Sequence, residues 1–270
     1  MPQASLTPHL SGVQETMLWA LHERACVAKR GDNRFHDPEC VRIYDSIDYD
    51  FAANFGTAGS LAAVRAARID QAIRDWLNVH PHGLIVSLGE GLETQAYRVD
   101  NGTMRWLSVD LPDAIAWRER FMRPTKRFRH LAMSALDKRW MDHIDARGGV
   151  CIVAQGLLMY FQPDEVRQLF VAIARRFPGG QMIFDLVARS LSKATEQGHE
   201  VTQSWTSPVM PWGLNGDEVV ATLRSWYPTL RRIRCARYRA VNRRPAIVED
   251  LLDHVLPHRR QLPSIVQVTF

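Results

Sequence analysis

Beyond residue 60 the chain alternates segments of helical periodicity with short apolar runs typical of strands. In residues 61–77 the apolar side chains recur at helical spacing, which predicts an amphipathic helix with one buried face. Seven runs predict strands, at residues 84–88, 105–110, 127–133, 150–154, 182–186, 230–238 and 265–270. Helical patterns separate most of these strands, at residues 111–122, 134–146, 163–177 and 217–226.

This order of elements predicts an α/β fold: a mostly parallel seven-stranded sheet, with helices on both faces because right-handed crossovers place them there. Residues 245–263 are long enough for one further helix before the last strand. In an open sheet of this class the ligand lies beyond the carboxyl ends of the strands. The residues that follow each strand are therefore the candidates for a functional site.

The first predicted strand runs into Gly89, Glu90 and Gly91. Glycines there let the backbone turn sharply and approach a ligand closely, and the next helix would offer its N-terminal amides. The second strand ends at Asp110, about 20 residues after Gly91, where a carboxylate can accept both hydroxyls of a ribose. A nicotinamide dinucleotide or S-adenosylmethionine fits this arrangement. S-adenosylmethionine is favoured, because Thr94 replaces the small residue of the dinucleotide fingerprint and little chain remains for a dehydrogenase substrate domain.

Three motifs, "GEGLETQAYR", "VDLP" and "AQGLLMYF", resemble in their order and spacing a class I methyltransferase family that uses S-adenosylmethionine. It is the leucine carboxyl methyltransferase family, and the likeness is greatest to its bacterial branch of tetracenomycin polyketide O-methyltransferases. The upstream segment "TMLWALHERACVAKRGDNRFHDPEC" is similar to that family's N-terminal helical region, including Asp37 and Pro38. The resemblance spans roughly the whole chain, and it implies a Rossmann-like fold with S-adenosylmethionine as methyl donor.

The resemblance also implies roles for individual residues. Gly89 and Gly91 would lie against the methionine part of the cofactor, and Asp110 would bind its ribose. Arg65 matches the family arginine that pairs with the cofactor carboxylate, and Arg68, one turn later, is the alternative. The predicted cofactor site also includes the neighbouring residues Glu90, Leu111 and Ala135.

Two positions depart from the family pattern. Ser134 stands where many relatives carry an Asp near the adenine, although Ser can still make one hydrogen bond there. Gln155 replaces a common Glu, which removes a negative charge from beside the sulfonium, so Gln155 is predicted to line the cofactor site and not to act as a catalytic acid. These departures leave open a cofactor-binding protein without catalysis.

The methyl acceptor is inferred from the chemistry. Methyl transfer from a sulfonium is an in-line displacement for which the enzyme must supply alignment. A carboxylate acceptor is already ionised near neutral pH and needs no general base, whereas a phenol, with a pKa of about 10, needs help. No His is paired with an acid at a suggestive spacing. The prediction is therefore an O-methyltransferase acting on a carboxyl group of a small molecule, polyketide-like or another secondary metabolite. A phenol or alcohol, a protein and a nucleic acid are the alternative acceptors.

The acceptor pocket would be closed by chain outside the sheet. Residues 188–216 hold Trp205, Met210 and Trp212 among turn residues. They predict either a lid over an apolar or aromatic acceptor or simply a cover for the edge of the core. Tyr160, in "LLMYF", lies near the cofactor if Gln155 does, and its hydroxyl could orient an acceptor. No catalytic residue is assigned.

A chain of 270 residues, 46% of them hydrophobic and without a linker-like tract, predicts a single methyltransferase domain over residues 1–270. Its parts are predicted as an N-terminal helical cap (1–60), a cofactor-binding core (61–187), a lid insertion (188–229) and C-terminal strands (230–270).

Composition narrows the partners. The net charge of +5 would permit a nucleic-acid partner, but the arginines are dispersed. The densest run, residues 230–244, alternates Arg with Ile233, Cys235 and Tyr238 as a half-buried strand does, so no nucleic acid is expected. The four cysteines are scattered, so no metal site is expected. With no apolar run able to cross a bilayer and no signal-like N-terminus, a cytoplasmic location is expected. The oligomeric state is left open.

Overall fold

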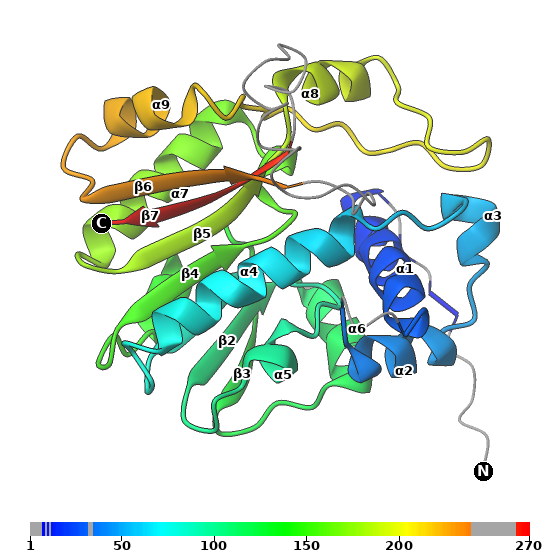
Figure 1. The fold of residues 1–270 in the computed structure, drawn as a ribbon, viewed down its shortest axis with the longest axis horizontal. Coiled ribbons are helices and arrows are strands. Elements are labelled where there is room, and N and C mark those ends of the chain that lie inside the picture. The colour runs from blue at the N-terminus through cyan, green and yellow to red at the C-terminus, as the bar shows by residue number, and fades with distance from the viewer. Residues whose placement is uncertain (1–6, 9, 11, 32–34, 239–262) are drawn as a thin grey trace.

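The computed structural model describes residues 7, 8, 10, 12–31, 35–238 and 263–270. Its centre is a seven-stranded sheet in the order β3-β2-β1-β4-β5-β7-β6, with helices on both faces (Figure 1). The strands are β1 (Leu84–Leu88), β2 (Arg105–Asp110), β3 (Phe128–Ala132), β4 (Val150–Ala154), β5 (Gln181–Leu186), β6 (Arg232–Arg237) and β7 (Ser264–Thr269). Strands β1 to β5 are parallel, and β7 runs antiparallel between β5 and β6. The predicted α/β class with a mostly parallel sheet is confirmed.

The α-helices are α1 (Thr16–Lys29), α2 (Pro38–Ser46), α3 (Phe51–Phe55), α4 (Leu61–Leu77), α5 (Gln95–Val99), α6 (Pro112–Phe121), α7 (Pro163–Arg176), α8 (Arg189–Glu196) and α9 (Val219–Trp226). Short 3-10 helices are η1 (Gly12–Glu15), η2 (Lys138–His143) and η3 (Leu158–Tyr160). Within the part of the chain that the structure describes, no helix has the length and apolar character needed to cross a membrane.

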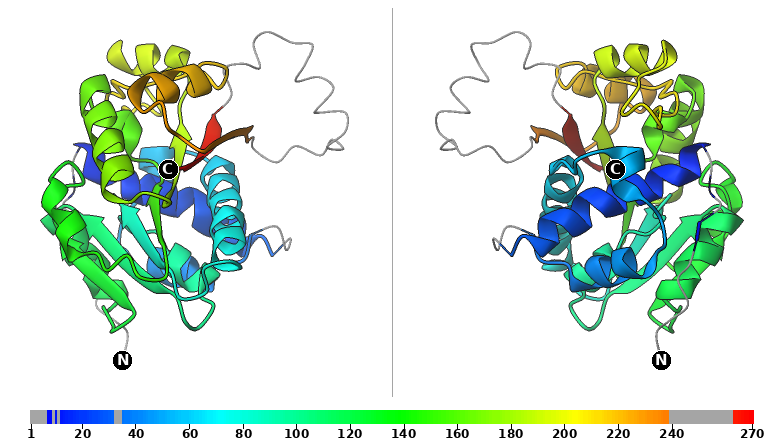
Figure 2. Two further views of the ribbon diagram at one scale, coloured as in Figure 1. Left: turned by 90° about the vertical axis from the view of Figure 1, so that its left-hand side faces the viewer. Right: turned by 90° about the vertical axis from the view of Figure 1, so that its right-hand side faces the viewer.

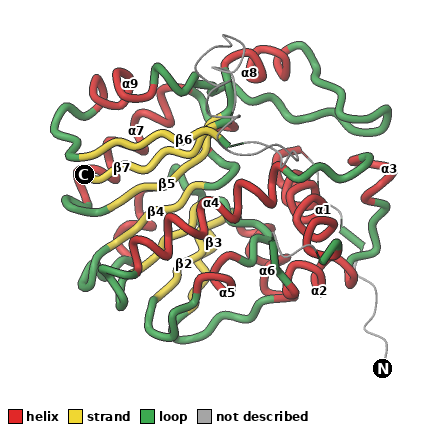
Figure 3. The backbone as a smooth tube through the Cα atoms, in the orientation of Figure 1, coloured by secondary structure: helices red, strands yellow, loops and turns green. Residues whose placement is uncertain are grey.

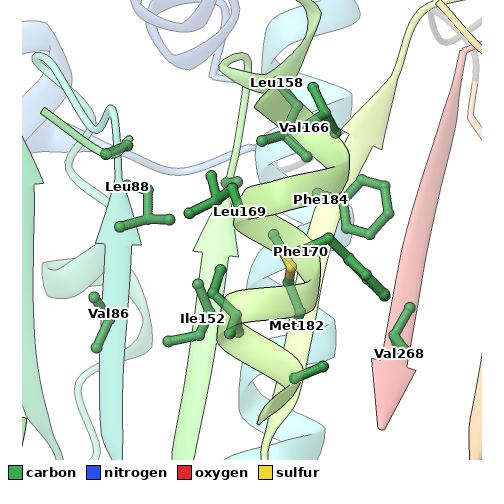
Figure 4. Close-up of a cluster of buried hydrophobic side chains, with 14 of the residues drawn as sticks. Val86, Leu88, Ile152, Leu158, Val166, Leu169, Phe170, Met182, Phe184 and Val268 are labelled. Carbon is green, nitrogen blue, oxygen red and sulfur yellow. The ribbon is translucent and has the colours of Figure 1, made fainter. Parts of the chain in front are cut away.

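Both faces of the sheet are buried, which is why its central strands are apolar throughout. On one face, Leu169 and Phe170 of α7 pack toward Ile152 of β4 and Met182 of β5 (Figure 4). On the other face, Ile69 and Ile73 of α4 join a cluster with Ile85, Cys151 and Ile183 from β1, β4 and β5. The odd and even positions of each strand therefore serve opposite layers, and the strand ends are held in fixed register.

The N-terminal helices pack against the same end of the sheet at which α4 begins (Figures 1 and 2). Their shared cluster joins Leu18 and Leu21 of α1 to Leu92, which follows β1. The start of α4 is tied to α1 as well, because Glu23 Oε2 accepts a hydrogen bond of 2.8 Å from the Ala62 amide. This contact fixes the N-terminus of α4 beside the carboxyl ends of the strands.

The segment between α8 and α9, residues 197–218, loops away from the sheet and reaches α3 (Figure 3). Thr202 Oγ1 donates to the Asn54 carbonyl at 2.6 Å, and Ser204 Oγ donates to the Ala53 carbonyl at 2.5 Å. Two parts of the chain far apart in sequence thus meet above the strand ends.

Two predictions differ from the structure, and a third falls on residues that the structure does not describe. The helix predicted at residues 134–146 is reduced to η2, because Asp137 caps a tight turn by accepting from the Arg139 amide. Trp140 then turns inward and donates to the Ala135 carbonyl at 2.9 Å. Among the described strands β6 pairs only with β7, at the edge of the sheet, and Cys235 is exposed where a buried position was predicted. The helix predicted at 245–263 lies outside the described residues, except for Pro263.

Candidate active site

A cavity of about 500 Å³ lies at the carboxyl ends of β1, β2, β4 and β5 and is closed on its other side by η1, α1 and the start of α4. All nine residues predicted for the cofactor site line it: Arg65, Gly89, Glu90, Gly91, Asp110, Leu111, Ser134, Ala135 and Gln155. They come from five separate stretches of sequence. The parallel strands bring them together because their carboxyl ends share one edge of the sheet.

The glycine turn after β1 is specific for glycine. Gly89 and Gly91 have φ angles of 61° and 51°, a region that side chains with a Cβ rarely adopt. A Cβ on Gly89 would lie 2.5 Å from Leu157 Cδ1, and one on Gly91 would lie 2.9 Å from Met17 Cβ. A side chain at either position would therefore be strained and would have to displace Leu157 or Met17.

Asp110 is held at the end of β2 by the same turn. Its Oδ2 accepts from the Gly91 amide at 2.7 Å, and its Oδ1 accepts from the Leu111 amide at 2.8 Å. Each carboxylate oxygen has a second lone pair, which leaves an acceptor for each of two ribose hydroxyls. Burial raises the pKa of the Asp110 carboxyl, while the two amides oppose that rise.

Arg65 lies on α4 with its guanidinium at the cavity wall, where Nη1 donates to Asp185 Oδ2 at 2.9 Å. Burial disfavours the charge, but Asp185 outweighs it and raises the pKa of Arg65. Arg65 Nε is buried without a partner among the described residues. Arg68 is exposed and does not line the cavity. Of the two arginines that the sequence offers, only Arg65 lies at the cavity wall.

Glu93 is a cavity residue that sequence reasoning missed. It is 7% exposed, and its Oε1 accepts from the side chain of Arg24, from Arg98 Nη1 at 2.7 Å and from the Thr94 amide at 2.9 Å. Burial opposes ionisation, but Arg24 and Arg98 outweigh it and hold the pKa of Glu93 at about 2. Glu93 Oε2 accepts from Gln155 Nε2 at 2.8 Å. Only its place in "GEGLET", two residues after the second glycine, could have indicated it.

Glu90 and Ser134, two further residues predicted for the cofactor site, have different hydrogen-bond partners. The Glu90 carboxylate is buried. Its Oε2 accepts a hydrogen bond from Trp106 Nε1 at 3.1 Å, and its Oε1 forms an ion pair with Arg118 Nη2 at 3.1 Å. Ser134 Oγ accepts from the Leu136 amide at 3.2 Å and closes the turn after β3. The Glu90 side chain is therefore committed to the protein interior.

The four acceptor-pocket candidates separate into two pairs. Tyr160 and Met210 line the cavity, and burial raises the pKa of the Tyr160 hydroxyl, which keeps its proton. Trp212 does not line the cavity, since its ring packs in the core against Phe184, with centroids 6.4 Å apart. Trp205 also lies outside it and packs against Trp19 at 5.2 Å.

The chemistry of the described residues is that of binding and alignment. No group of three or more His, Cys, Asp or Glu among residues 12–31, 35–238 and 263–270 is arranged to hold a metal ion. Arg65, the glycine turn and the Asp110 carboxylate lie together on the wall of this cavity.

Comparisons with known proteins agree with this geometry. The sequence model of the family described as leucine carboxyl methyltransferase matches residues 24–174. Over 184 residues the chain is 29% identical to the tetracenomycin polyketide synthesis O-methyltransferase TcmP of Streptomyces glaucescens, covering 67% of this chain and 68% of that protein.

Solved structures share the fold. A Thermobifida fusca protein assigned as a methyltransferase matches with a TM-score of 0.58 and 15% identity, covering 97% of this chain and 95% of that one. The CurJ carbon methyltransferase matches with a TM-score of 0.56 and 12% identity, covering 95% of this chain and 67% of that one. With the family match over more than half of its length, the chain belongs to the leucine carboxyl methyltransferase family and is an S-adenosylmethionine-dependent methyltransferase.

Proposed function

We propose that this enzyme methylates an oxygen of a small-molecule acceptor, and that the acceptor oxygen belongs to a carboxyl group. The observation that carries the proposal is the titratable lining of the cavity: among the described residues it contains no His, Cys or Lys. A reaction that needs no general base is the one suited to such a wall.

Three of the acids that line the cavity are paired with arginines. Glu90 is bound by Arg118, Glu93 by Arg24 and Arg98, and Asp185 by Arg65. Arg24 and Arg98 hold the pKa of Glu93 at about 2 against the effect of burial, so the Glu93 carboxylate is a weak base. A carboxylic acid acceptor is ionised well below neutral pH and reacts without such a base.

The positions of the side chains support the roles proposed for them. Bound in the cavity, S-adenosylmethionine supplies a methyl group on a positively charged sulfur. Gly89 and Gly91 leave room for its methionine chain, Asp110 accepts from the ribose hydroxyls, and Arg65 pairs with the carboxylate. Tyr160 retains its proton and can donate a hydrogen bond that orients the acceptor.

The acceptor side of the cavity is apolar. Met159, Val187 and Met210 form a hydrophobic cluster against which Tyr160 and Leu191 pack, and all five line the cavity. Such a wall suits a mainly apolar or aromatic molecule. The relative TcmP is an O-methyltransferase of polyketide synthesis, which supports a polyketide-like acid as acceptor.

The test is a screen of aromatic and polyketide-like acids, with phenols and alcohols of matched size, using S-adenosylmethionine labelled on its methyl group. We expect products from the acids, and we expect mild alkali to release the label, because alkali cleaves a methyl ester and leaves a methyl ether intact. An alkali-stable product whose single-turnover rate rises about tenfold per pH unit would identify a hydroxyl acceptor and overturn the carboxyl assignment.

A further inference from the structure

Two segments from opposite ends of the sequence cover the acceptor side of the cavity. The first is η1 with the start of α1, which lines the cavity through Val13 and Thr16, and the Thr16 side chain contacts the Tyr160 hydroxyl. The second is the loop of residues 197–218, which reaches the cavity through Met210 (Figure 3). The shape of the acceptor side therefore depends on how these two segments are held together.

Glu15, the residue directly before α1, joins the two segments. Its Oε2 accepts a hydrogen bond from Trp205 Nε1 in the loop at 3.0 Å. Its Oε1 accepts from the Tyr49 hydroxyl, just before α3, at 2.8 Å. One carboxylate thus binds two residues that lie 190 and 34 positions away in the chain.

The Glu15 side chain does not serve its own helix. A side chain at the residue before a helix can accept from the free amides of the first turn. Glu15 makes no such capping bond. Its hydrogen bonds to Tyr49 and Trp205 are charge-assisted, and bonds of this kind are stronger than those between neutral groups. We call Glu15, Tyr49 and Trp205 the Glu15 clasp.

Both donors of the Glu15 clasp are fixed by their surroundings. Trp205 is 6% exposed, and its ring packs edge to face against Trp19, with centroids 5.2 Å apart, and against Phe55 at 5.0 Å. A buried indole N–H needs an acceptor, and Glu15 supplies it. Burial, together with the hydrogen bond to Glu15, raises the pKa of the Tyr49 hydroxyl, which keeps its proton and donates.

The clasp acts on the cavity through the loop. Trp205 itself does not line the cavity, but Trp19, against which it packs, does. At Met210 the loop is held by α8, since the Met210 amide donates to Thr195 Oγ1 at 2.9 Å and its carbonyl accepts from Ser192 Oγ at 2.7 Å. The stretch from Trp205 to Met210 is therefore fixed at one end by the N-terminal helices and at the other by α8.

We propose that Glu15 is a positioning residue for the methyl acceptor. By binding Tyr49 and Trp205 at once, it holds the loop of residues 197–218 against η1 and α1 and so sets the shape of the apolar wall that carries Met210. This inference rests on the proposed use of that end of the cavity for the acceptor.

The experiment measures steady-state kinetics with the best acceptor from the screen, and affinity for S-adenosylhomocysteine by calorimetry. In Glu15→Ala we expect the acceptor KM to rise about fivefold or more, with kcat and the affinity for S-adenosylhomocysteine within about twofold of wild type. Glu15→Gln can still accept from Trp205 and can donate to the Tyr49 oxygen, so it should keep the KM within about twofold of wild type. Equal losses for acceptor and S-adenosylhomocysteine, or a loss of stability alone, would make Glu15 a merely structural residue.

Tyr49→Phe and Tyr44→Phe form a matched pair in the N-terminal helices. Both tyrosines pack against Phe51, but the Tyr44 hydroxyl contacts His22 Nδ1 at 3.2 Å and not Glu15. Tyr49→Phe should raise the acceptor KM about two- to threefold, and Tyr44→Phe should leave it unchanged. Equal rises in the two variants would overturn the proposal.

Trp205→Phe keeps an aromatic ring and removes the indole donor, so it should also raise the acceptor KM about two- to threefold. Adding it to Glu15→Ala should cause no further rise, because both changes remove the same contact. Additive effects would show that Trp205 acts independently of Glu15. The single variants Tyr49→Phe and Trp205→Phe decide the question even if Glu15→Ala does not fold.

Met210→Ala separates this proposal from the acceptor site on which it rests. If it raises the acceptor KM while Glu15→Ala, Tyr49→Phe and Trp205→Phe do not, the acceptor site stands and the clasp is refuted. If none of these variants alters the KM, the acceptor binds elsewhere and both proposals fail. An acceptor that proves to be a phenol overturns the carboxyl assignment alone, because the clasp concerns the apolar wall.

Discussion

The two walls of the cavity differ in how well their residues were predicted from the sequence. One wall is made by the ends of β1, β2, β3 and β4, and every residue predicted for it from sequence, from Gly89 to Gln155, lines the cavity. The other wall includes η1, α1 and residues between β5 and α9, and only Met210 of the three candidates in residues 188–216 lines it.

The difference teaches how far local sequence determines position. A residue after a strand of a parallel sheet has its place set by the ladder, so strand and turn signals are enough to locate it. The local sequence does not decide whether an aromatic residue in a long loop faces the core, the N-terminal helices or the cavity. Trp212 packs in the core against Phe184, and Trp205 packs against Trp19 of the N-terminal helices. Both partners are distant in sequence.

The largest effect should come from Gly91→Val on the strand-end wall. Its φ of 51° and the approach of 2.9 Å to Met17 leave no room for a side chain. We expect affinity for S-adenosylhomocysteine to fall by about a hundredfold or more, with a folding cost of about 1–3 kcal/mol from the strained backbone. Calorimetry and thermal unfolding measure the two. Affinity within twofold of wild type would remove the turn from the site.

Asp110→Ala should have the next largest effect. It deletes the acceptor for two hydroxyls and releases the Gly91 amide, and each such charged hydrogen bond contributes about 1.5–3 kcal/mol. Affinity for S-adenosylhomocysteine should fall at least about tenfold. NADH serves as the control ligand and should bind to neither form. Normal cofactor binding by Asp110→Ala would give the acid another role.

Arg65 and Arg68 provide a matched comparison on α4. Arg65→Met should reduce affinity for S-adenosylhomocysteine about five- to tenfold, because the proposed charge-assisted contact with the ligand carboxylate is lost. Arg68→Met alters an exposed side chain and should leave the affinity for S-adenosylhomocysteine within about twofold of wild type. The reverse order would show that Arg68, the alternative from sequence, binds the carboxylate.

A smaller effect should separate Met210 from Trp212 on the loop wall. Met210→Ala opens the apolar side of the cavity and should raise the acceptor KM about threefold without changing cofactor affinity. Trp212→Phe should lower stability by about 1–3 kcal/mol and leave both binding constants unchanged, because it alters core packing. A Trp212→Phe variant with normal stability and a raised acceptor KM would restore its place in the pocket.

The smallest effect should be the pH dependence of stability that arises from Glu93 and its ion pairs with Arg24 and Arg98. The pKa of Glu93 falls from an ordinary 4.5 to about 2 on folding, so its ionised form stabilises the protein above pH 4.5. That stabilisation is lost as the pH falls from 4.5 toward 2. We expect the stability difference between wild type and Glu93→Gln, measured by urea unfolding, to narrow across this interval. A constant difference between pH 5 and pH 2.5 would contradict the assigned pKa.

The sequence by itself determined the strands, α4 and the turn after β1. The runs 84–88, 105–110 and 150–154 match β1, β2 and β4 in full, because buried parallel strands are apolar on both faces and end at polar turn residues. Gly89, Gly91 and Asp110 followed from the same signals, since backbone conformation and strand ends are local properties.

Only the tertiary structure decided which polar groups meet. The position of β7 between β5 and β6, the contact of Arg65 with Asp185 and the contact of Glu93 with Gln155 join residues that lie far apart in the chain. Their energies arise from burial and from partners, and neither is written in a local pattern. For the same reason residues 134–146, helical by periodicity, became η2, because Trp140 was drawn into the core.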